Sequence, residues 1–300
     1  MSTRIAYYAY GSPDVLRVED EHPDEPGPGQ VRLRQEMIGV NPVDWKMVAG
    51  YFRQSDRAPF PHVPGWASTG IIEQVGPGVA GLSVGDAVIA GARGGAYREQ
   101  LVIDAHLVVP RPETVSIEQA AALPSSAVAG YSMVQNLRIT DEDTLLVHGA
   151  AGSVGAATVQ IALDQGARVI GTASAHNHNY LRSLGAIPVL YGDALASALR
   201  RLGPITASAD AVGGRESIDA TRAVLVYGGR AVTAWGDEHS HAARIPWVQH
   251  PDDELEQTVA IAARGALTVR IGETFPLGAA AESLKLSQAG HPAGKILLAP

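Results

Sequence analysis

The feature that most constrains the fold is a strand, a glycine-rich turn and a helix that follow one another without a break. Residues 144–148 form an apolar run, and residues 153–165 carry apolar side chains at helical spacing. The turn between them consists only of small residues, namely Gly149, Ala150, Ala151 and Gly152. This order is typical of nucleotide-binding α/β proteins, in which the backbone of the turn approaches a pyrophosphate.

The start of the expected helix supplies groups that such a ligand needs. The backbone amides around Ser153 and Val154 lie in a first helical turn, where the helix dipole also favours negative charge. Gly155 lets the helix pack closely against the preceding strand. The same pattern can also be a tight strand–helix turn that binds nothing, but the strand before it and the helix after it favour the binding interpretation.

The rest of the chain shows two different sequence patterns. Residues 1–110 contain short alternating runs separated by glycine and proline, which predicts a β-rich barrel or sandwich. After residue 116 strands alternate with helices, which predicts a parallel sheet. We expect its strands at residues 144–148, 168–172, 187–190, 207–212 and 230–234. The remaining expectations are a helix over 253–264, a strand around 267–269, a helix over 279–288 and a final strand over 295–298.

The end of the second parallel strand indicates which nucleotide is bound. NAD-binding proteins place an acid about 20 residues beyond the glycine motif, where it holds the ribose 2′-hydroxyl. This chain has Ser174, His176 and Asn177 there, and no acid between Asp164 and Asp193. Hydroxyl, amide and protonated imidazole groups donate hydrogen bonds to a 2′-phosphate, so we expect NADPH rather than NADH. A solvated loop histidine remains the alternative for His176.

Composition excludes several other functions. The chain has 300 residues, no cysteine, and 31 acidic against 23 basic side chains, for a net charge of −8. Disulfides, thiolate metal ligands and a cysteine nucleophile are therefore absent. The clustered cations that nucleic acids require are missing, and no apolar run approaches the roughly 18 residues that span a bilayer. We expect a cytoplasmic protein that binds neither nucleic acid nor a membrane.

Several motifs, in their order and spacing, resemble one family over nearly the whole chain. They are GVNPVDWK at 39–46, GIIEQVG at 70–76, AAALP at 120–124, VHGAAGSVG at 147–155 and GKILL at 294–298. With these residues the chain resembles zinc-independent members of the medium-chain dehydrogenase/reductase superfamily, in the quinone oxidoreductase (zeta-crystallin-like) group.

The resemblance implies an α/β protein with a GroES-like β-rich catalytic domain and a Rossmann domain built on a doubly wound parallel sheet. The implied boundaries are 1–121 for the catalytic domain, 122–264 for the NADP-binding domain and 265–300 for a C-terminal segment that returns to the catalytic domain. Such proteins are commonly homodimers joined along the edges of their Rossmann sheets.

The chemistry implied by the resemblance is hydride transfer from NADPH to a quinone or an α,β-unsaturated carbonyl. Zinc-dependent relatives hold their metal with cysteine, histidine and carboxylate ligands, whereas this chain has no cysteine and reads Gly65-Trp66-Ala67 where a Gly-His-Glu triplet would stand. We therefore expect no metal. A conjugated acceptor suits such a site, since hydride adds to the far carbon and one donor stabilises the enolate oxygen.

The catalytic candidates are Asn41, Lys46 and Tyr51. By resemblance, Asn41 lies near the nicotinamide and the substrate. Lys46 is one of three lysines among 23 basic residues, which suggests a specific use for its ammonium as a proton donor or oxyanion partner. A surface cation is the alternative for Lys46, and a structural role is the alternative for Tyr51. Tyr191 is expected at the adenosine end of the cofactor, and Gly213 lets the nicotinamide ring approach the backbone.

Two departures from the family pattern leave other functions open. Ala67 stands where relatives often have an acid, and Ala129 stands where they often have threonine. Both remove polar groups near the substrate. A repurposed member that catalyses a non-redox step, such as a cyclisation in a biosynthetic pathway, is therefore an alternative. A cofactor-binding regulator is another, although the acidic charge argues against an RNA-binding version.

Overall fold

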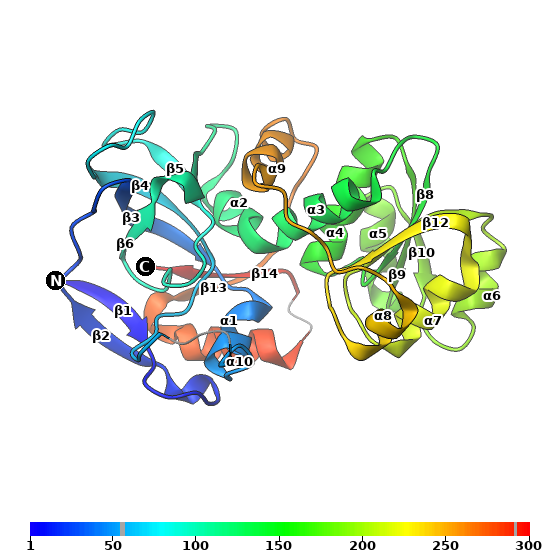
Figure 1. Ribbon diagram of the computed structural model, residues 1–300, viewed down its shortest axis with the longest axis horizontal. Helices are drawn as coiled ribbons and strands as arrows, with labels where there is room; N and C mark the ends of the chain where they lie inside the picture. The colour runs from blue at the N-terminus through cyan, green and yellow to red at the C-terminus, as the bar shows by residue number, and fades with distance from the viewer. Residues whose placement is uncertain (55–57, 291–292) are drawn as a thin grey trace. The chain divides into compact units, whose positions relative to one another are not determined.

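The computed structural model describes residues 1–54, 58–290 and 293–300. The chain divides into two compact units. The first unit contains Met1–Ser125 and Val269–Pro300, and the second contains Ser126–Thr268, so both chain ends belong to the first unit (Figure 1). Among the described residues, no helix is both long and apolar enough to cross a membrane.

A seven-stranded sheet is the frame of the first unit. Its strands are β3 (Gln30–Gly39), β4 (Ala67–Val75), β5 (Ala87–Ala90), β6 (Gln100–Asp104), β7 (Val108–Pro110), β13 (Ile271–Pro276) and β14 (Lys295–Ala299). The order is β13-β14-β3-β4-β5-β7, with β6 also pairing with β3. β1 (Ser2–Ala6) and β2 (Arg17–Glu21) form a separate antiparallel pair. Because β14 pairs with β3, the C-terminal segment extends the sheet that N-terminal residues begin.

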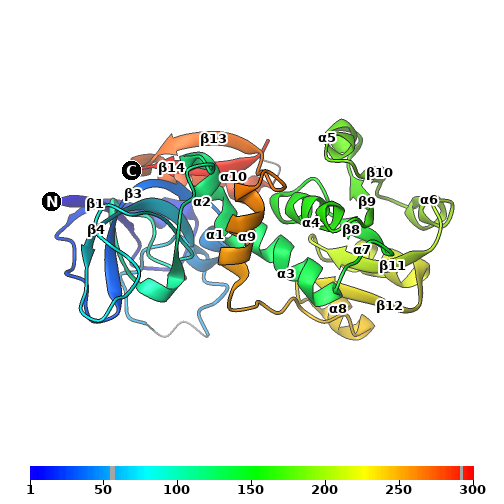
Figure 2. The same cartoon turned by 90° about the horizontal axis from the view of Figure 1, so that it is seen from above.

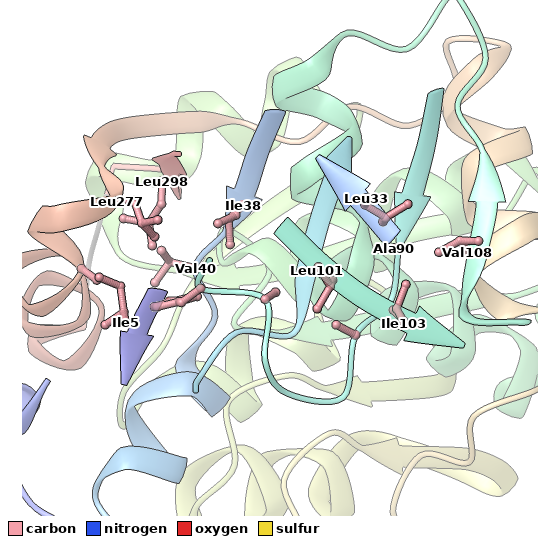
Figure 3. Packing of buried hydrophobic residues seen from close by; sticks show 14 of the residues in the cluster. Ile5, Leu33, Ile38, Val40, Ala90, Leu101, Ile103, Val108, Leu277 and Leu298 are labelled. Carbon is pink, nitrogen blue, oxygen red and sulfur yellow. The ribbon is translucent and has the colours of Figure 1, made fainter. Parts of the chain in front are cut away.

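Alternation along the strands builds the core of the first unit. In β3, Val31 and Leu33 are fully buried, whereas the intervening Arg32 is only partly buried, as the two-residue period of a strand requires. Figure 3 shows Leu33 of β3 and Leu101 of β6 within this cluster, together with Leu298 from the C-terminal strand. Each fully buried side chain of this size contributes about 1.5–3 kcal/mol. The β-rich N-terminal fold expected from the sequence is confirmed.

Three helices accompany this sheet: α1 (Pro42–Val48), α2 (Ile117–Ala122) and α10 (Ala280–Ala289). α1 begins where the sequence motif supplies both a cap and a proline. Asn41 is the N-cap with extended backbone, Pro42 occupies the first helical position, and Oδ2 of Asp44 accepts a hydrogen bond from the Asn41 amide at 2.8 Å. α1 packs against α10, which joins the motif to the C-terminal segment.

The second unit is a parallel α/β fold. Its strands are β8 (Thr144–His148), β9 (Arg168–Ala173), β10 (Ile187–Leu190), β11 (Ile205–Asp210) and β12 (Leu225–Thr233). They lie in the order β10-β9-β8-β11-β12, which is the Rossmann arrangement with β8 at the centre. The expected doubly wound parallel sheet is confirmed.

Helices cover both faces of this sheet (Figures 1 and 2). They are α3 (Val128–Leu137), α4 (Ser153–Asp164), α5 (His178–Ser183), α6 (Leu195–Arg200) and α7 (Arg215–Val224). Two further helices pack on these helices: α8 (Glu238–Ala243) on α7, and α9 (Glu254–Ala263) on α3. α6 and α7 pack on the face that presents Leu146 and Ile170. α4, which packs against α3, contacts β8 from the opposite face, where the neighbouring Leu145 and Val147 point.

Two sequence expectations are corrected. β11 ends at Asp210 rather than at residue 212, because Val212 lies beyond the sheet edge and its amide donates to Asp210 Oδ1 at 3.2 Å. The strand expected around residues 267–269 is wrong. The side-chain amide of Gln119 takes the place of a strand partner there, since it accepts from the Val269 amide and donates to the Val269 carbonyl, both at 2.8 Å. The strand forms later, as β13.

Candidate active site

The glycine-rich turn joins the end of β8 to the start of α4 at the centre of the parallel sheet. Gly149 has a φ of +67°, in the left-handed region that favours glycine, and the Gly152 amide donates to the Gly149 carbonyl at 3.0 Å to close the turn. Gly152 is the N-cap of the helix. In open α/β sheets ligands bind beyond the carboxyl ends of the strands, where the strand order reverses, and this turn lies at that point.

Gly155 holds the first turn of α4 against this loop. A Cβ at position 155 would lie 2.3 Å from the carbonyl oxygen of Gly149 and 2.8 Å from the Cα of Ala150. Both contacts are with backbone atoms, so no side-chain rotation relieves them. Only glycine permits this approach.

The loop amides separate into two groups. Gly149 donates to Thr172 Oγ1 at 3.3 Å and Ala150 donates to the Thr172 carbonyl at 3.0 Å. In contrast, within the part of the chain that the structure describes, the amides of Ala151, Ser153 and Val154 have no hydrogen-bond acceptor. Unpaired amides at the start of a twelve-residue helix, whose dipole favours anions, fit the diphosphate of a dinucleotide.

Three polar residues that follow β9 contact one another. Ser174 Oγ lies 3.1 Å from His176 Nδ1, and Asn177 Nδ2 donates to Ser174 Oγ at 3.3 Å. The Asn177 amide also donates to the Ser174 carbonyl at 2.9 Å, which closes a short turn. The three side chains therefore form one cluster of hydrogen-bonding groups directly beyond the strand, in which His176 is exposed and Ser174 and Asn177 are partly buried.

Tyr191 and Gly213 also lie just beyond the carboxyl ends of strands of this sheet. Leu190 pairs with Ala173 in the register of β10 and β9, so Tyr191 and Ser174 follow neighbouring strand ends, and Tyr191 is about half exposed. Gly213, with a φ of +78°, follows β11, and a Cβ there would lie 2.5 Å from Cδ1 of Trp235. The structure thus gathers all the nucleotide-binding candidates along one edge of the second unit.

The catalytic candidates belong to the first unit and differ in exposure. Asn41 is fully buried, and its side-chain amide donates to the Gly39 carbonyl at 3.1 Å. Lys46 is half-buried with Nζ 5.6 Å from the centre of the Trp45 ring, and partial burial lowers the pKa of its ammonium. Tyr51 is mostly exposed and meets Trp45 edge-on, with ring centres 5.7 Å apart.

Sequence reasoning missed three residues around Asn41. Asp44, Tyr97 and Lys295 are almost completely buried, and Lys295 Nζ donates to Asn41 Oδ1. Burial raises the pKa of Asp44 to about 7 and lowers the pKa of Lys295 to about 8, although each charge partly offsets the shift of the other. Burial also raises the pKa of Tyr97 well above its ordinary value. The scarcity of lysine, which drew attention to Lys46, applies equally to Lys295.

Among the residues that the structure describes, no group of three or more histidine, cysteine, aspartate or glutamate side chains could hold a metal ion.

Two family models match most of the chain. Residues 27–113 match the model of the alcohol dehydrogenase GroES-like domain, and residues 184–298 match that of zinc-binding dehydrogenases. A chloroplast envelope quinone oxidoreductase homolog of Arabidopsis thaliana is 30% identical over 315 residues, covering 93% of this chain and 94% of the relative. The chain belongs to the medium-chain dehydrogenase/reductase superfamily, in its quinone oxidoreductase group.

Solved structures of this superfamily match the whole chain. A quinone oxidoreductase from Coxiella burnetii is 25% identical with a TM-score of 0.89, covering 100% of this chain and 99% of that one. A mycobacterial quinone oxidoreductase is 28% identical with a TM-score of 0.85 and full coverage of both chains, and it has also been solved in complex with NADPH.

Two other relatives in sequence are matched over only part of their length. The quinone oxidoreductase of Pseudomonas aeruginosa is 38% identical over 180 residues, which cover 58% of this chain and 53% of the relative. The polyketide synthase GfsB of Streptomyces halstedii is 32% identical over 293 residues, which cover 90% of this chain but 5% of the synthase. The match thus spans about half the length of the first relative and a small part of the second.

Proposed function

We propose that this member of the superfamily is an NADPH-dependent oxidoreductase that reduces a quinone or an α,β-unsaturated carbonyl without a metal. The observation that carries the proposal is the loop from Gly149 to Gly155. Gly155 lets the first turn of α4 lie close to the backbone of Gly149 and Ala150. The amides of Ala151, Ser153 and Val154, which have no acceptor among the described residues, suit a diphosphate. Tyr191 would meet the adenosine end of the cofactor and Gly213 the nicotinamide end.

The preference for NADPH rests on the cluster after β9. Ser174, His176 and Asn177 supply hydrogen-bond donors where an NAD-binding protein has a carboxylate, and a carboxylate would repel a 2′-phosphate. The mycobacterial quinone oxidoreductase that shares the fold was solved with NADPH, which supports the same choice. Each charge-assisted hydrogen bond contributes about 1.5–3 kcal/mol, so one such bond gives at least tenfold discrimination.

A nicotinamide cofactor held by this loop would supply the hydride, which a conjugated acceptor would take at the carbon distant from its carbonyl. The chain must then stabilise the negative oxygen that forms and deliver a proton. We assign this role to Lys46, because its lowered pKa makes the ammonium a better acid, with Tyr51 as the second donor. Asn41 is proposed to orient the site, since its side chain is buried and held by Lys295.

Metal independence rests on the donor set. The chain has no cysteine, and the described residues contain no cluster of three histidine or carboxylate side chains suited to a metal. A conjugated acceptor needs no Lewis acid, because its carbonyl oxygen can be stabilised by hydrogen-bond donors.

A homodimer is proposed through β12. Among the described strands, β12 lies at one edge of the parallel sheet, and Tyr227 on it is fully exposed while Val226 is partly exposed. An exposed edge strand with apolar side chains is a template for pairing. Two copies related by a twofold axis would join their sheets there, each contributing the same strand.

The direct test is turnover. The purified chain is mixed with NADPH and a panel of quinones and enones, and the absorbance of reduced nicotinamide is followed. We expect oxidation with at least one conjugated acceptor, unchanged after treatment with a strong chelator. Tight binding of NADPH without turnover across the panel would favour the non-redox alternative, and loss of activity with the chelator would contradict metal independence.

A further inference from the structure

A row of buried polar side chains lies beneath the glycine-rich loop. His148, the last residue of β8, is 1% exposed, and its ring contacts hydroxyl groups on both sides. Nδ1 lies 3.4 Å from Thr172 Oγ1 of β9, and Nε2 lies 3.1 Å from Thr221 Oγ1 of α7. Thr221 Oγ1 in turn lies 2.9 Å from Ser208 Oγ of β11. All four side chains are almost completely buried.

The first hydrogen bond of this row has only one possible direction. The backbone amide of Gly149 can only donate, so Thr172 Oγ1 accepts from it at 3.3 Å. The single hydroxyl hydrogen of Thr172 is then free to donate to Nδ1 of His148. With Nδ1 as the acceptor, the ring proton lies on Nε2, which then donates to Thr221 Oγ1. The hydroxyl of Thr221 then donates to Ser208.

This direction requires a neutral imidazole, because Nδ1 must accept. Burial lowers the pKa of His148 to about 4, although the nearby charge of Asp210 acts in the opposite sense. Asp210 is the residue opposite His148 in the pairing of β8 and β11, and its own oxygens accept from the amides of Val212 and Gly213 and from Thr233 Oγ1. The ring is therefore neutral throughout the physiological range.

This row of hydrogen bonds begins at the loop itself. Thr172 binds the amides of both Gly149 and Ala150, through its hydroxyl and its carbonyl. These two amides consequently point into the sheet and not toward a ligand. Further along the loop, the amides of Ala151, Ser153 and Val154 have no acceptor among the residues that the structure describes.

We propose that Thr172 and His148 are positioning residues for the cofactor diphosphate: they hold the Gly149 peptide so that the unpaired amides of the loop face one anion. The proposal rests on the proposed function, because it assumes that a dinucleotide binds this loop. It adds that affinity for the diphosphate depends on two side chains that never touch it.

The test compares two ligands on the same variants. Calorimetry measures the affinity for NADPH, which contains the diphosphate, and for adenosine 2′-monophosphate, which does not. Thr172→Val removes the hydroxyl with almost no change of shape. We expect it to weaken NADPH binding about tenfold, the factor that corresponds to about 1.4 kcal/mol, while the affinity for adenosine 2′-monophosphate changes less than about twofold.

Two further variants separate positioning from general damage. Thr172→Ser keeps the hydroxyl and should restore NADPH affinity to within about twofold of the wild type. Thr258→Val makes the same change at a buried threonine of α9, whose hydroxyl donates to the Glu254 carbonyl at 2.6 Å, and should leave both affinities unchanged. In the steady state Thr172→Val should raise the KM for NADPH and leave kcat nearly unchanged.

His148→Phe provides an independent probe, because it removes both ring nitrogens and keeps an aromatic ring. If the residues act as one chain, His148→Phe combined with Thr172→Val weakens NADPH binding no more than the stronger single variant does. Equal loss of affinity for both ligands, or unchanged NADPH binding in either folded variant, would overturn the proposal. A wild-type chain that binds no NADPH would instead overturn the proposed function.

Discussion

The hydroxyl of Tyr97 donates to Oδ2 of Asp44 at 3.0 Å, and both side chains are fully buried. The same oxygen accepts the backbone amide of Asn41 at 2.8 Å. One carboxylate oxygen therefore fixes the start of α1 to a segment 53 positions later in the chain. Asn41, a candidate of the active site, is held from both sides by this contact and by Lys295.

Removal of the Tyr97 hydroxyl should destabilise the first unit. Tyr97→Phe leaves a buried carboxylate short of one donor, which costs about 1–3 kcal/mol. Urea denaturation measures the loss. Tyr8→Phe is the matched control, since its exposed hydroxyl donates to Glu19 at 3.2 Å and its removal should cost less than about 0.5 kcal/mol. Equal effects of the two variants would contradict the account of this contact.

Asp44 should also make stability depend on pH. Burial raises its pKa from 3.8 to about 7, so between these values the folded chain holds a proton that the unfolded chain has released. The free energy of unfolding therefore decreases as the pH rises from about 4 to 7. Asp44→Asn removes this titration, so the stability of the variant relative to the wild type should increase over the same range. Parallel denaturation profiles for the two proteins would contradict the raised pKa.

The candidate nucleotide-binding loop of the second unit is predictable from sequence because each of its parts is determined locally. An apolar run forms β8, small residues allow the turn that Gly149 makes at a φ of +67°, and helical spacing forms α4. The polar cluster after β9 is determined locally too, since Ser174, His176 and Asn177 all lie within four residues of the end of that strand. The end of β11 was harder to predict from sequence, because Val212 is apolar, as strand residues often are, but lies exposed in the loop that follows.

The surroundings of Asn41 could not be predicted in this way. Lys295 lies 254 positions from Asn41, and their contact depends on the pairing of β14 with β3, which no local pattern specifies. Tyr97 reaches Asp44 from a segment between strands. Likewise, the strand expected around residues 267–269 fails because a distant side chain, Gln119, satisfies that backbone. Local periodicity does not contain these long-range contacts.

Gly155→Ala should impair both the loop and nucleotide binding. The new methyl group would press on the Gly149 carbonyl and the Ala150 Cα, which are backbone atoms, so the helix start must shift. We expect a loss of about 1–3 kcal/mol in stability and at least a tenfold loss of NADPH affinity, measured by thermal denaturation and calorimetry. Gly278→Ala is the control, because a Cβ there meets nothing within 4 Å. Normal NADPH binding by Gly155→Ala would contradict the role of the loop.

Ser174→Asp should change the cofactor preference. The new carboxylate would repel the 2′-phosphate of NADPH and could accept the ribose 2′-hydroxyl of NADH. The ratio of kcat/KM for NADPH to that for NADH should decrease at least about tenfold. Ser197→Asp adds the same charge on the exposed surface of α6 and should leave the ratio unchanged. A ratio that is unaffected by Ser174→Asp would place the 2′-phosphate elsewhere.

Tyr227→Asp should prevent dimerisation. The variant places a charge on the exposed edge of β12, where two copies of the strand would pair. Light scattering during gel filtration should report the mass of two chains for the wild type and of one chain for the variant. Tyr8→Asp, at an exposed tyrosine of the first unit, should remain dimeric. A monomeric wild type would rule out this interface.

The most direct test of the central claim is calorimetric titration of the purified wild-type chain with NADPH and, separately, with NADH. We expect saturable binding of one NADPH per chain, with NADH bound at least about tenfold more weakly. The absence of binding by both nucleotides would contradict it, because the loop from Gly149 to Gly155 would then be a structural turn and not a cofactor site.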